Sequence, residues 1–568
     1  MMLQSRRRTT IGTQGDCCDR PNLARSGWLR AGGALTLLAT VGCSGAEGAV
    51  AEADDGTTLP APGGEADAGP PAVIGQPVPG VYVSTSKGTD VADGAPSRPV
   101  KTLEVAMRLA KERNVPVIAC AETYAESVTL VDGVTMYGYF DCSRGDLWPR
   151  VKASAIIASP TSPAVLAENL KTPARFEGFD VRAPNLMDVP ATKEPAASSY
   201  GMIIKNTTGL SLAEVTIRGG EGQPGASGPE PANGNSETGG SVEGENSSVQ
   251  KKCVSSNLAV CEIIRRVGGS AGGTSKCAHG ANGGPGGNGG DAAVLDSRGV
   301  RELIGSDARG QPLSSRPETA VGAPENSAAN VIGTAGKRGD PGLLGKHGTW
   351  TFGAEGFTPG DGTKGAIGSP GQGGGGGGGS SGWLTDDYLL VSLTPGAFFI
   401  DGGARLGAAG AGGGAGGCGG MPGSPGRGGG ASIGLFVSSS DVQIAASRIE
   451  SQRGGAAGKG ALGTLGTPGG RGGLGHVTVT TVAGFMNFSR TPGVYGTAGG
   501  KGGDGGAAGL SGHGAAGPSF ALVYTGKKPT MTQVDLVPGE AGAGFEAIER
   551  EGQTLPPIVG TARKEYSF

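Results

Sequence analysis

Short runs of apolar or alternating residues recur from about residue 81 onward, separated by polar turns. Val81–Val83 and Val115–Cys120 are mainly apolar, whereas Ser127–Leu130 and Val134–Tyr137 alternate apolar with polar positions. Such runs, bounded by turn residues, are typical of short β-strands. The chain is therefore expected to consist mainly of β-structure.

One stretch of the chain has helical periodicity instead. Leu103, Ala106, Met107 and Ala110 recur at intervals of three and four, and Thr102 precedes them. Threonine is a favoured N-cap, because its hydroxyl oxygen accepts a hydrogen bond from a backbone N–H of the first turn. We expect an amphipathic helix that begins after Thr102 and buries these four side chains.

The apolar pattern repeats at distant points of the chain. Segment 204–222 aligns without a gap with segment 523–541. A third copy, in 437–449, is one residue shorter than the first between its matched positions, and weaker echoes lie at 166–181 and 477–485. The matched positions are Ile204, Leu212, Val215 and Ile217 in the first copy, Val523, Met531, Val534 and Leu536 in the second, and Val437, Ile444, Ser447 and Ile449 in the third. Each copy has two strand-like stretches around a polar turn, a unit that buries its apolar edge only when stacked. A solenoid with the copies in equivalent coils is predicted.

Glycine-rich tracts separate these copies. Glycine fills 115 of the 568 positions, well above its usual share of about 7%, and the tracts lie at about 219–292, 305–387, 402–432, 453–475 and 492–518. Glycine brings no side chain to bury, so these tracts cannot form an ordinary core. Their Gly-X-Y period is too interrupted for a collagen triple helix. They are either ordered by mutual backbone hydrogen bonding or flexible.

Three stretches of the block at residues 80–145 carry a family resemblance: Asp90 to Leu103 with the helix that follows, Glu122–Val128, and Tyr137–Asp141. The block resembles the N-terminal unit of right-handed parallel β-helix proteins of the pectate-lyase-like superfamily. The resemblance implies an all-β fold, a right-handed parallel β-helix-like solenoid with an N-terminal capping helix, interrupted by long glycine-rich loops. The glycine-rich tracts resemble the repeats of mycobacterial PE-PGRS proteins, which pack as polyglycine-II helices. The N-terminal PE domain of that family has no counterpart here.

The N-terminus has the layout of a secretory signal. A basic stretch ends at Arg30, an apolar run covers Ala31–Val41, and Gly42 and Cys43 follow. An apolar run of about 12 residues is too short for a bilayer that needs about 20. The sequence of residues 38–43 resembles a bacterial lipobox, with Thr40 in the position most often taken by leucine.

The lipobox resemblance implies that Cys43 is diacylated and becomes the mature N-terminus. Ser44, in place of aspartate, implies sorting to the outer membrane of a Gram-negative envelope. The chain then divides into a lipoprotein signal peptide (1–43), a disordered Ala-, Gly-, Pro- and acid-rich tether (44–79), and three further regions. These are the capping unit (80–145), the repetitive solenoid with glycine-rich insertions (146–545), and a C-terminal tail (546–568).

Six cysteines follow Cys43 in the sequence: Cys120, Cys142, Cys253, Cys261, Cys277 and Cys418. An even number in an oxidising compartment favours disulfides, and without a C-x-x-C pair the usual zinc spacing is missing. In the β-helix start that residues 80–145 resemble, the chain returns beside the earlier strand. The resemblance therefore implies a Cys120–Cys142 disulfide, with a pair of buried free thiols as the alternative.

Carboxylates are the groups that a polysaccharide lyase or hydrolase on such a fold would need, paired or clustered around calcium. Asp180, Asp188, Glu214 and Asp535 lie in or near coil segments but do not recur at one coil position, so we expect solvated surface acids. A cluster of three or more carboxylates on a coil face, or an Arg or Lys beside them, would favour an enzyme.

Other candidate chemistry is weak. The stretches 286–294 and 499–507 come near a calcium-binding nonapeptide but lack its large apolar residue and are not in tandem. The four histidines do not suggest a catalytic triad, and no phosphate-binding loop is present. We predict no catalytic residue, no cofactor and no metal site.

The formal net charge of −3 is small for 568 residues and argues against nucleic acid as a partner. We therefore expect a cell-envelope lipoprotein, held at the outer membrane or cell surface by its lipid anchor. It would act as a structural or adhesive element through its repetitive β and glycine-rich surfaces, toward envelope polysaccharide or other cell-surface components. The alternative is a carbohydrate-active enzyme, a polysaccharide lyase or hydrolase on a β-helix fold.

Overall fold

The computed structural model describes residues 78–192, 194–231, 244, 269–277, 284–288, 309–324, 331–380, 390–391, 398–399, 408–478, 481–483, 488–490 and 494–568. Cys43 lies outside these residues, as do the rest of the expected signal peptide and nearly all of the expected tether. The described part of the chain contains one α-helix, and most of its strands pair in parallel. It is therefore a predominantly β structure, as expected.

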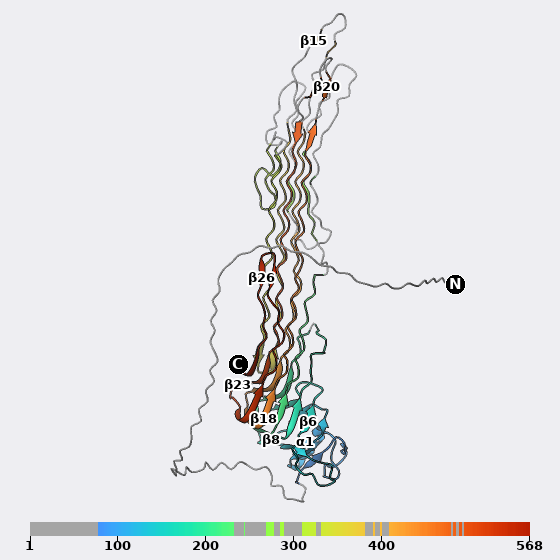
Figure 1. Cartoon of the computed structure of the whole chain (residues 1–568), viewed down its shortest axis with the longest axis vertical. Coiled ribbons are helices and arrows are strands. Elements are labelled where there is room, and N and C mark those ends of the chain that lie inside the picture. The colour runs from blue at the N-terminus through green and yellow to red at the C-terminus, as the bar shows by residue number, and fades with distance from the viewer. Residues whose placement is uncertain are drawn as a thin grey trace, which may run out of the picture. The chain divides into compact units, whose positions relative to one another are not determined.

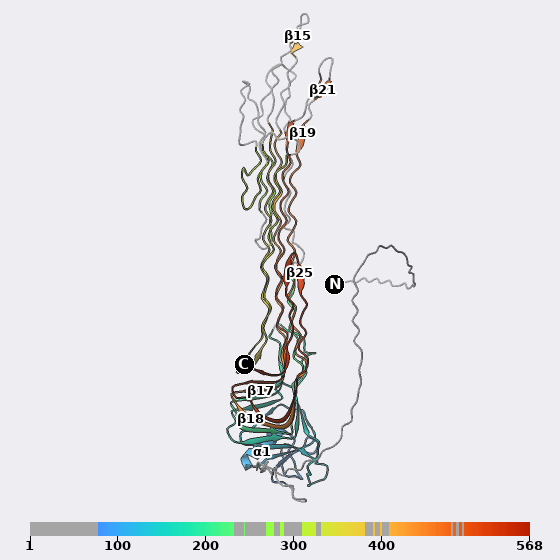
Figure 2. The same cartoon turned by 60° about the vertical axis from the view of Figure 1, so that its left-hand side comes forward.

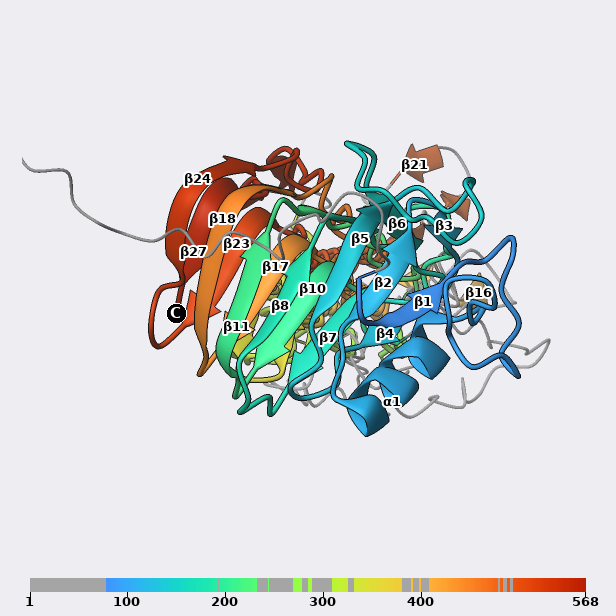
Figure 3. The ribbon, with the colours of Figure 1, turned by 90° about the horizontal axis from the view of Figure 1, so that it is seen from below.

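Two parallel sheets hold most of the strands (Figure 3). The first sheet contains β1 (Val81–Val83), β2 (Val117–Cys120), β3 (Thr123–Tyr124), β5 (Met136–Phe140), β6 (Ala155–Ala158), β8 (Ala174–Glu177), β9 (Phe179–Arg182), β11 (Thr208–Ala213), β12 (Thr216–Arg218), β18 (Asp441–Glu450) and β24 (Thr530–Val537). The second sheet contains β4 (Val128–Thr129), β7 (Val165–Glu168), β10 (Ser199–Lys205), β17 (Ser432–Ser438), β23 (Ser519–Thr525) and β27 (Ala562–Ser567).

The remaining described strands form short antiparallel pairs. These are β13 (Thr351–Gly353) with β14 (Gly356–Thr358), β15 (Leu390–Val391) with β16 (Phe398–Phe399), β19 (His476–Thr478) with β22 (Val494–Gly496), β20 (Thr481–Ala483) with β21 (Phe488–Arg490), and β25 (Ile548–Arg550) with β26 (Gln553–Leu555). The pairing of β19 shows that the weak echo at 477–485 does not form a parallel coil, so this part of the repeat prediction is wrong.

The single described helix, α1 (Leu103–Arg113), has the expected cap and face. The Thr102 side chain accepts a hydrogen bond from the Val105 N–H, and Leu103, Ala106, Met107 and Ala110 are buried. The helix ends at Asn114, whose left-handed backbone is a common way to terminate a helix. In Figure 3 α1 lies beside β1, β2 and β4, at the N-terminal end of the stacked strands.

The repeat copies stack in register across β11, β18 and β24. Leu212 pairs with Ile444, and Ile444 pairs with Met531. Similarly, Ile217 and Leu536 flank Ile449 in a second row. The first-copy residues are fully buried in the main hydrophobic core, against which the last-copy residues of β24 pack at the edge of the sheet. The predicted equivalence of these positions is confirmed.

The predicted equivalence of Ile204 and Val523 is wrong by one residue. Through β17, Ile204 is in register with Tyr524 instead. The pairing of β11 with β18 shifts near Gly209, which has a φ of 77°, so the first copy holds one residue more than the later copies at this point. A slip of one residue turns a strand side chain to the opposite face. Val523 accordingly belongs to a separate, aromatic-rich cluster.

Residues 546–568, which the sequence suggested as a tail, include β25, β26 and β27. Strand β27 pairs in parallel with β23 and is an edge strand of the second sheet. The C-terminus of the chain is therefore part of the packed structure.

The described glycine-rich tracts begin or end at strands, some of them in the two sheets and others in the short antiparallel pairs. Tract 451–475 follows β18, for example, and tract 497–518 leads into β23. These tracts run side by side in Figures 1 and 2 and are joined by backbone hydrogen bonds. Of the two alternatives left open by the sequence, the described tracts have mutual backbone hydrogen bonding.

Candidate functional site

Five glycine-rich tracts form a hydrogen-bonded assembly that we call the glycine bundle. They are residues 331–350, 359–380, 408–431, 451–475 and 497–518. Tract 497–518 bonds to each of the other four. Its N–H groups donate to 359–380 and 451–475, and its carbonyls accept from 331–350 and 408–431, with partners recurring every third residue. This recurrence is the geometry expected of threefold extended chains.

Close backbone approach explains why glycine is required in the central tract. A Cβ atom on Gly503 would lie 1.9 Å from the Lys337 carbonyl oxygen, and one on Gly505 would lie 1.9 Å from the Cys418 carbonyl oxygen. Both distances are far inside van der Waals contact. The neighbouring tracts on two sides therefore leave no room for a side chain at either position.

The sequence carries a signal for this arrangement that our reasoning did not use. Residues 499–506 have glycine at two of every three positions, whereas the outer tract 331–350 has glycine at every third position from Gly333 to Gly348. Two glycines in three mark a tract contacted on several sides. The calcium-like stretch 499–507 is part of this central tract, and its Asp504 carboxylate accepts the Gly469 N–H at 2.9 Å and pairs with Lys501 at 3.1 Å.

Outer tracts of the bundle present side chains at regular intervals. At a rise of about 3.1 Å per residue, equivalent positions recur about every 9 Å. In tract 331–350 these include Leu343, which is 80% exposed, and the exposed Lys337 and Lys346. Because the backbone of each tract is bonded to its neighbours, the bundle provides a fixed spacing of surface side chains that suits repeated weak contacts.

Six charged side chains form a second feature on the first sheet, across β9, β12, β18 and β24. Neighbours in this charged ladder alternate in sign. Arg218 donates to Asp180 at 3.3 Å and to Glu450 at 3.0 Å. The complete ladder runs in the order Arg182, Asp180, Arg218, Glu450, Arg448 and Asp535.

The inference that the four coil acids do not recur at one position is wrong for two of them, although Asp535 is a surface acid, as expected, with 58% of its side chain exposed. Asp180 and Asp535 occupy the same lateral row of the sheet, separated by Thr216 and Arg448. The sequence concealed this because no carboxylate occupies the two intervening positions. Glu214, by contrast, is exposed in a turn at φ 50°.

The ladder has the composition that would favour an enzyme, with three carboxylates and arginines beside them. Its electrostatics favour charge pairing instead. Burial alone would raise the pKa of Glu450, but hydrogen bonds and charges from Arg448 and Arg218 outweigh this and lower it. A general acid near neutral pH needs a raised pKa. The ladder is therefore better suited to holding strands together than to proton transfer.

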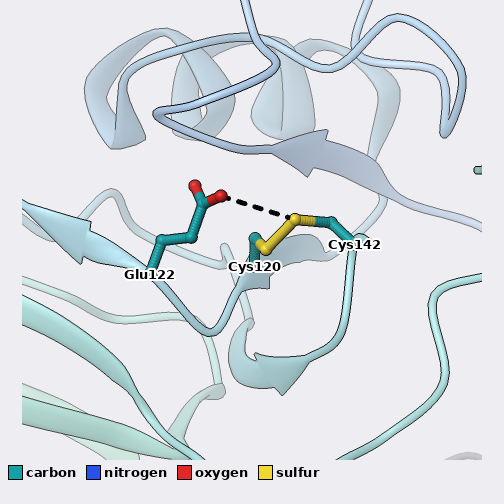
Figure 4. Close-up of side chains that lie close together, drawn as sticks. All are labelled: Cys120, Glu122 and Cys142. Carbon is teal, nitrogen blue, oxygen red and sulfur yellow. Dashed lines mark hydrogen bonds between the residues drawn. A yellow bond between two sulfur atoms is a disulfide. The ribbon is translucent and has the colours of Figure 1, made fainter. Parts of the chain in front are cut away.

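Cys120, Glu122 and Cys142 lie close together within residues 80–145 (Figure 4). The structure joins the two cysteines by a disulfide with a Cα–Cα distance of 5.6 Å, inside the usual range of about 4.4–6.8 Å. This is the pair that the family resemblance implied. Disulfide sulfurs are not thiolates, which are the form of cysteine that binds metals.

The Glu122 carboxylate binds the loop after β1. It accepts hydrogen bonds from the Thr85 N–H at 2.8 Å, from the Ser84 hydroxyl at 3.0 Å and from Ser86. Burial raises the pKa of Glu122, but these hydrogen bonds lower it further than burial raises it. Glu122 is therefore a structural acceptor here, and the cluster does not form a metal centre.

A second disulfide joins Cys277 to Cys418, with a Cα–Cα distance of 5.9 Å. It connects residues 269–277 to tract 408–431 of the glycine bundle. The sequence did not predict this pairing. The predicted lipidation site, Cys43, lies outside the described residues. The one helix of the described part, α1, is not long and apolar enough to span a membrane.

Comparison with known proteins gives no relative: no protein-family model, curated protein or solved structure matches the chain.

Proposed function

We propose that the chain is a lipoprotein of the cell envelope that acts as a structural or adhesive surface element. In this proposal the parallel sheets are a right-handed β-helix-like solenoid, capped by α1, and the glycine bundle presents side chains to partners. A diacyl anchor at Cys43 would hold the protein at the outer membrane or cell surface. Envelope polysaccharide or another surface component would be the partner.

The observation that carries the proposal is the backbone bonding of the glycine bundle. Flexible loops would lose entropy on binding, whereas tracts fixed by interchain hydrogen bonds present their side chains already ordered. Regular spacing also allows many weak contacts to add up. The paired state of the charged ladder supports a structural role for the strands over catalysis.

A binding and cleavage screen distinguishes the adhesive proposal from the enzyme alternative. We expect residues 44–568 to bind envelope polysaccharides on a glycan array without releasing shorter oligosaccharides. If the protein were an enzyme, the charged ladder would be the best candidate for its catalytic site. Glu450→Gln removes one carboxylate of the ladder and keeps the size of the side chain. Cleavage of any polysaccharide that disappears in Glu450→Gln would contradict the proposal and support a lyase or hydrolase.

Membrane attachment depends on Cys43 in this proposal. Cys43→Ala should move the protein from the detergent-phase membrane fraction to the soluble fraction, because a non-acylated residue cannot carry the anchor. Cys253→Ala, at a cysteine after the expected tether, is the matched control and should partition like the unchanged protein. Unchanged partitioning of Cys43→Ala would rule out the lipid anchor.

A further inference from the structure

His513 is a fully buried histidine in the central tract of the glycine bundle. One face of its ring stacks on His347 of tract 331–350, with centroids 5.1 Å apart and planes 14° apart. Phe545 also contacts the ring, at a centroid distance of 4.5 Å. Phe545 belongs to residues 538–561, which we call the C-terminal segment. The histidine pair therefore lies where this segment meets the bundle.

The hydrogen bonds of the two rings define their neutral forms. His513 Nδ1 accepts the Gly460 N–H at 2.9 Å, and His347 Nδ1 accepts the His513 backbone N–H at 3.1 Å. A neutral ring that accepts at Nδ1 carries its proton on Nε2. His347 can then donate from Nε2 to the Pro556 carbonyl oxygen, 2.8 Å away. Both rings thus contact the C-terminal segment, one through Phe545 and the other through Pro556.

Protonation of His513 is incompatible with this arrangement. A second proton would sit on Nδ1 and point at the Gly460 N–H, turning a hydrogen bond into a donor–donor contact. Nε2 of the same ring is buried without a hydrogen-bond partner among the described residues. A charged imidazolium at this place would therefore be poorly solvated as well as poorly paired.

We infer that His513 and His347 form an acid-sensitive clasp that holds the C-terminal segment on the glycine bundle. The clasp is closed while both rings are neutral. A positive charge on His513 opens it, because the ring loses its place between Gly460, His347 and Phe545.

The charges around the clasp favour opening in acid. The charges of His347 on tract 331–350 and of Lys459 on tract 451–475 both lower the pKa of His513. Arg427 on tract 408–431 is paired with Asp361 on tract 359–380. The C-terminal segment carries the exposed Glu546, and its Glu551 is already paired with Arg338 of tract 331–350. None of these groups offers a buried anion to an imidazolium.

The direction of the pH dependence follows from the pKa of His513. Burial, together with the charges of His347 and Lys459, lowers that pKa from 6.5 to about 4. Between these two pH values the open form binds more protons than the closed form, so closure becomes more stable as pH rises. The stabilisation is fully present above about pH 6.5 and is lost as pH falls toward 4.

Hydrogen exchange of the full chain, followed by mass spectrometry, tests the clasp. The readout is the protection factor of peptides from 538–561 divided by that of peptides from 81–218. A protection factor already removes the intrinsic pH dependence of exchange, and the division removes any change of stability that the two regions share. We expect the ratio to fall at least tenfold between pH 7 and pH 4. In His513→Asn, whose amide oxygen can still accept the Gly460 N–H but does not titrate, the ratio should stay constant.

His476→Asn is the matched control, since it removes an exposed histidine on β19 and should leave the tenfold fall intact. If His513→Asn already opens the segment at pH 7, an NMR titration of the His513 ring in the unchanged protein decides the matter. A measured pKa at or above 6.5 would overturn the clasp, as would a wild-type ratio that does not change with pH or that falls equally in His513→Asn.

Discussion

Leu212→Asp is expected to unfold the stacked strands around β11. Leu212 is fully buried and lies in register between Phe176 on β8 and Ile444 on β18. Loss of a buried leucine side chain costs about 2–5 kcal/mol. An unpaired carboxylate in the same place adds a desolvation penalty of several kcal/mol. The sum exceeds the roughly 4–5 kcal/mol that marks an exceptional single substitution.

Ser211→Asp is the matched control, because Ser211 is the neighbouring residue on the opposite face of the same strand. Its side chain is partly exposed, so the new carboxylate stays hydrated and stability should change by less than about 1 kcal/mol. Urea unfolding, followed by far-ultraviolet circular dichroism and by proteolysis of residues 81–218, measures both variants. A Leu212→Asp protein with an unchanged urea midpoint would show that this position is not in the core.

The helix and the repeat rows were predictable because their signals are local. The spacing of Leu103, Ala106, Met107 and Ala110 defines one helical face, and Thr102 completes it with a cap, all within nine residues. The rows through Leu212 and Ile217 depend on segments that are distant in sequence but similar in pattern. Pairing equivalent strands in parallel puts equivalent apolar residues in contact, so similarity of pattern was sufficient.

The error at Val523 has a local cause that apolar spacing does not reveal. The extra residue near Gly209 is absorbed in an irregular strand pairing, and an alignment without gaps carries the shift to every earlier position. Ile204 was therefore placed one residue away from its true counterpart, Tyr524. Only a gap introduced at the glycine would have corrected it.

The histidine pair could not be predicted, because its two members are brought together only by the packing of distant glycine-rich tracts. The charged ladder was missed for another reason, since the matched repeat segments already place most of its strands in register. Asp180 and Asp535 lie in one row because their strands stack in register. The two positions between them hold residues other than carboxylates, which hides the recurrence in the sequence. His347 and His513 lie in tracts whose glycine pattern gives no register. The pattern of two glycines in three marks tract 497–518 as the central one, but it does not fix how far each tract is shifted along its neighbours, so the pairing of the two histidines could not be read from it.

Gly503→Ala should disrupt the glycine bundle. The new Cβ atom would lie 1.9 Å from the Lys337 carbonyl oxygen and 2.4 Å from its carbonyl carbon. Both are backbone atoms, so relief requires tract 331–350 to move away from tract 497–518. The Gly503 N–H and C=O are also bonded, to Gln372 and Gly417 respectively, at 2.8 Å each. Overpacking of this kind costs about 1–3 kcal/mol or more, and here it also strains bonds to three tracts.

Hydrogen exchange along tracts 331–350, 359–380 and 497–518 measures this effect. In Gly503→Ala we expect protection of these tracts to fall at least tenfold, while peptides from 81–218 keep theirs, since the close contacts and hydrogen bonds of Gly503 go to tracts 331–350, 359–380 and 408–431. Lys501→Ala is the matched control. It leaves alanine two residues away, at a position that already has a Cβ atom and whose side chain is about half exposed, so it removes only an exposed ion pair with Asp504 and adds no atom between the tracts. Equal protection in the two variants would mean that close backbone approach does not hold the bundle together, and that side-chain contacts or the Cys277–Cys418 disulfide do so instead.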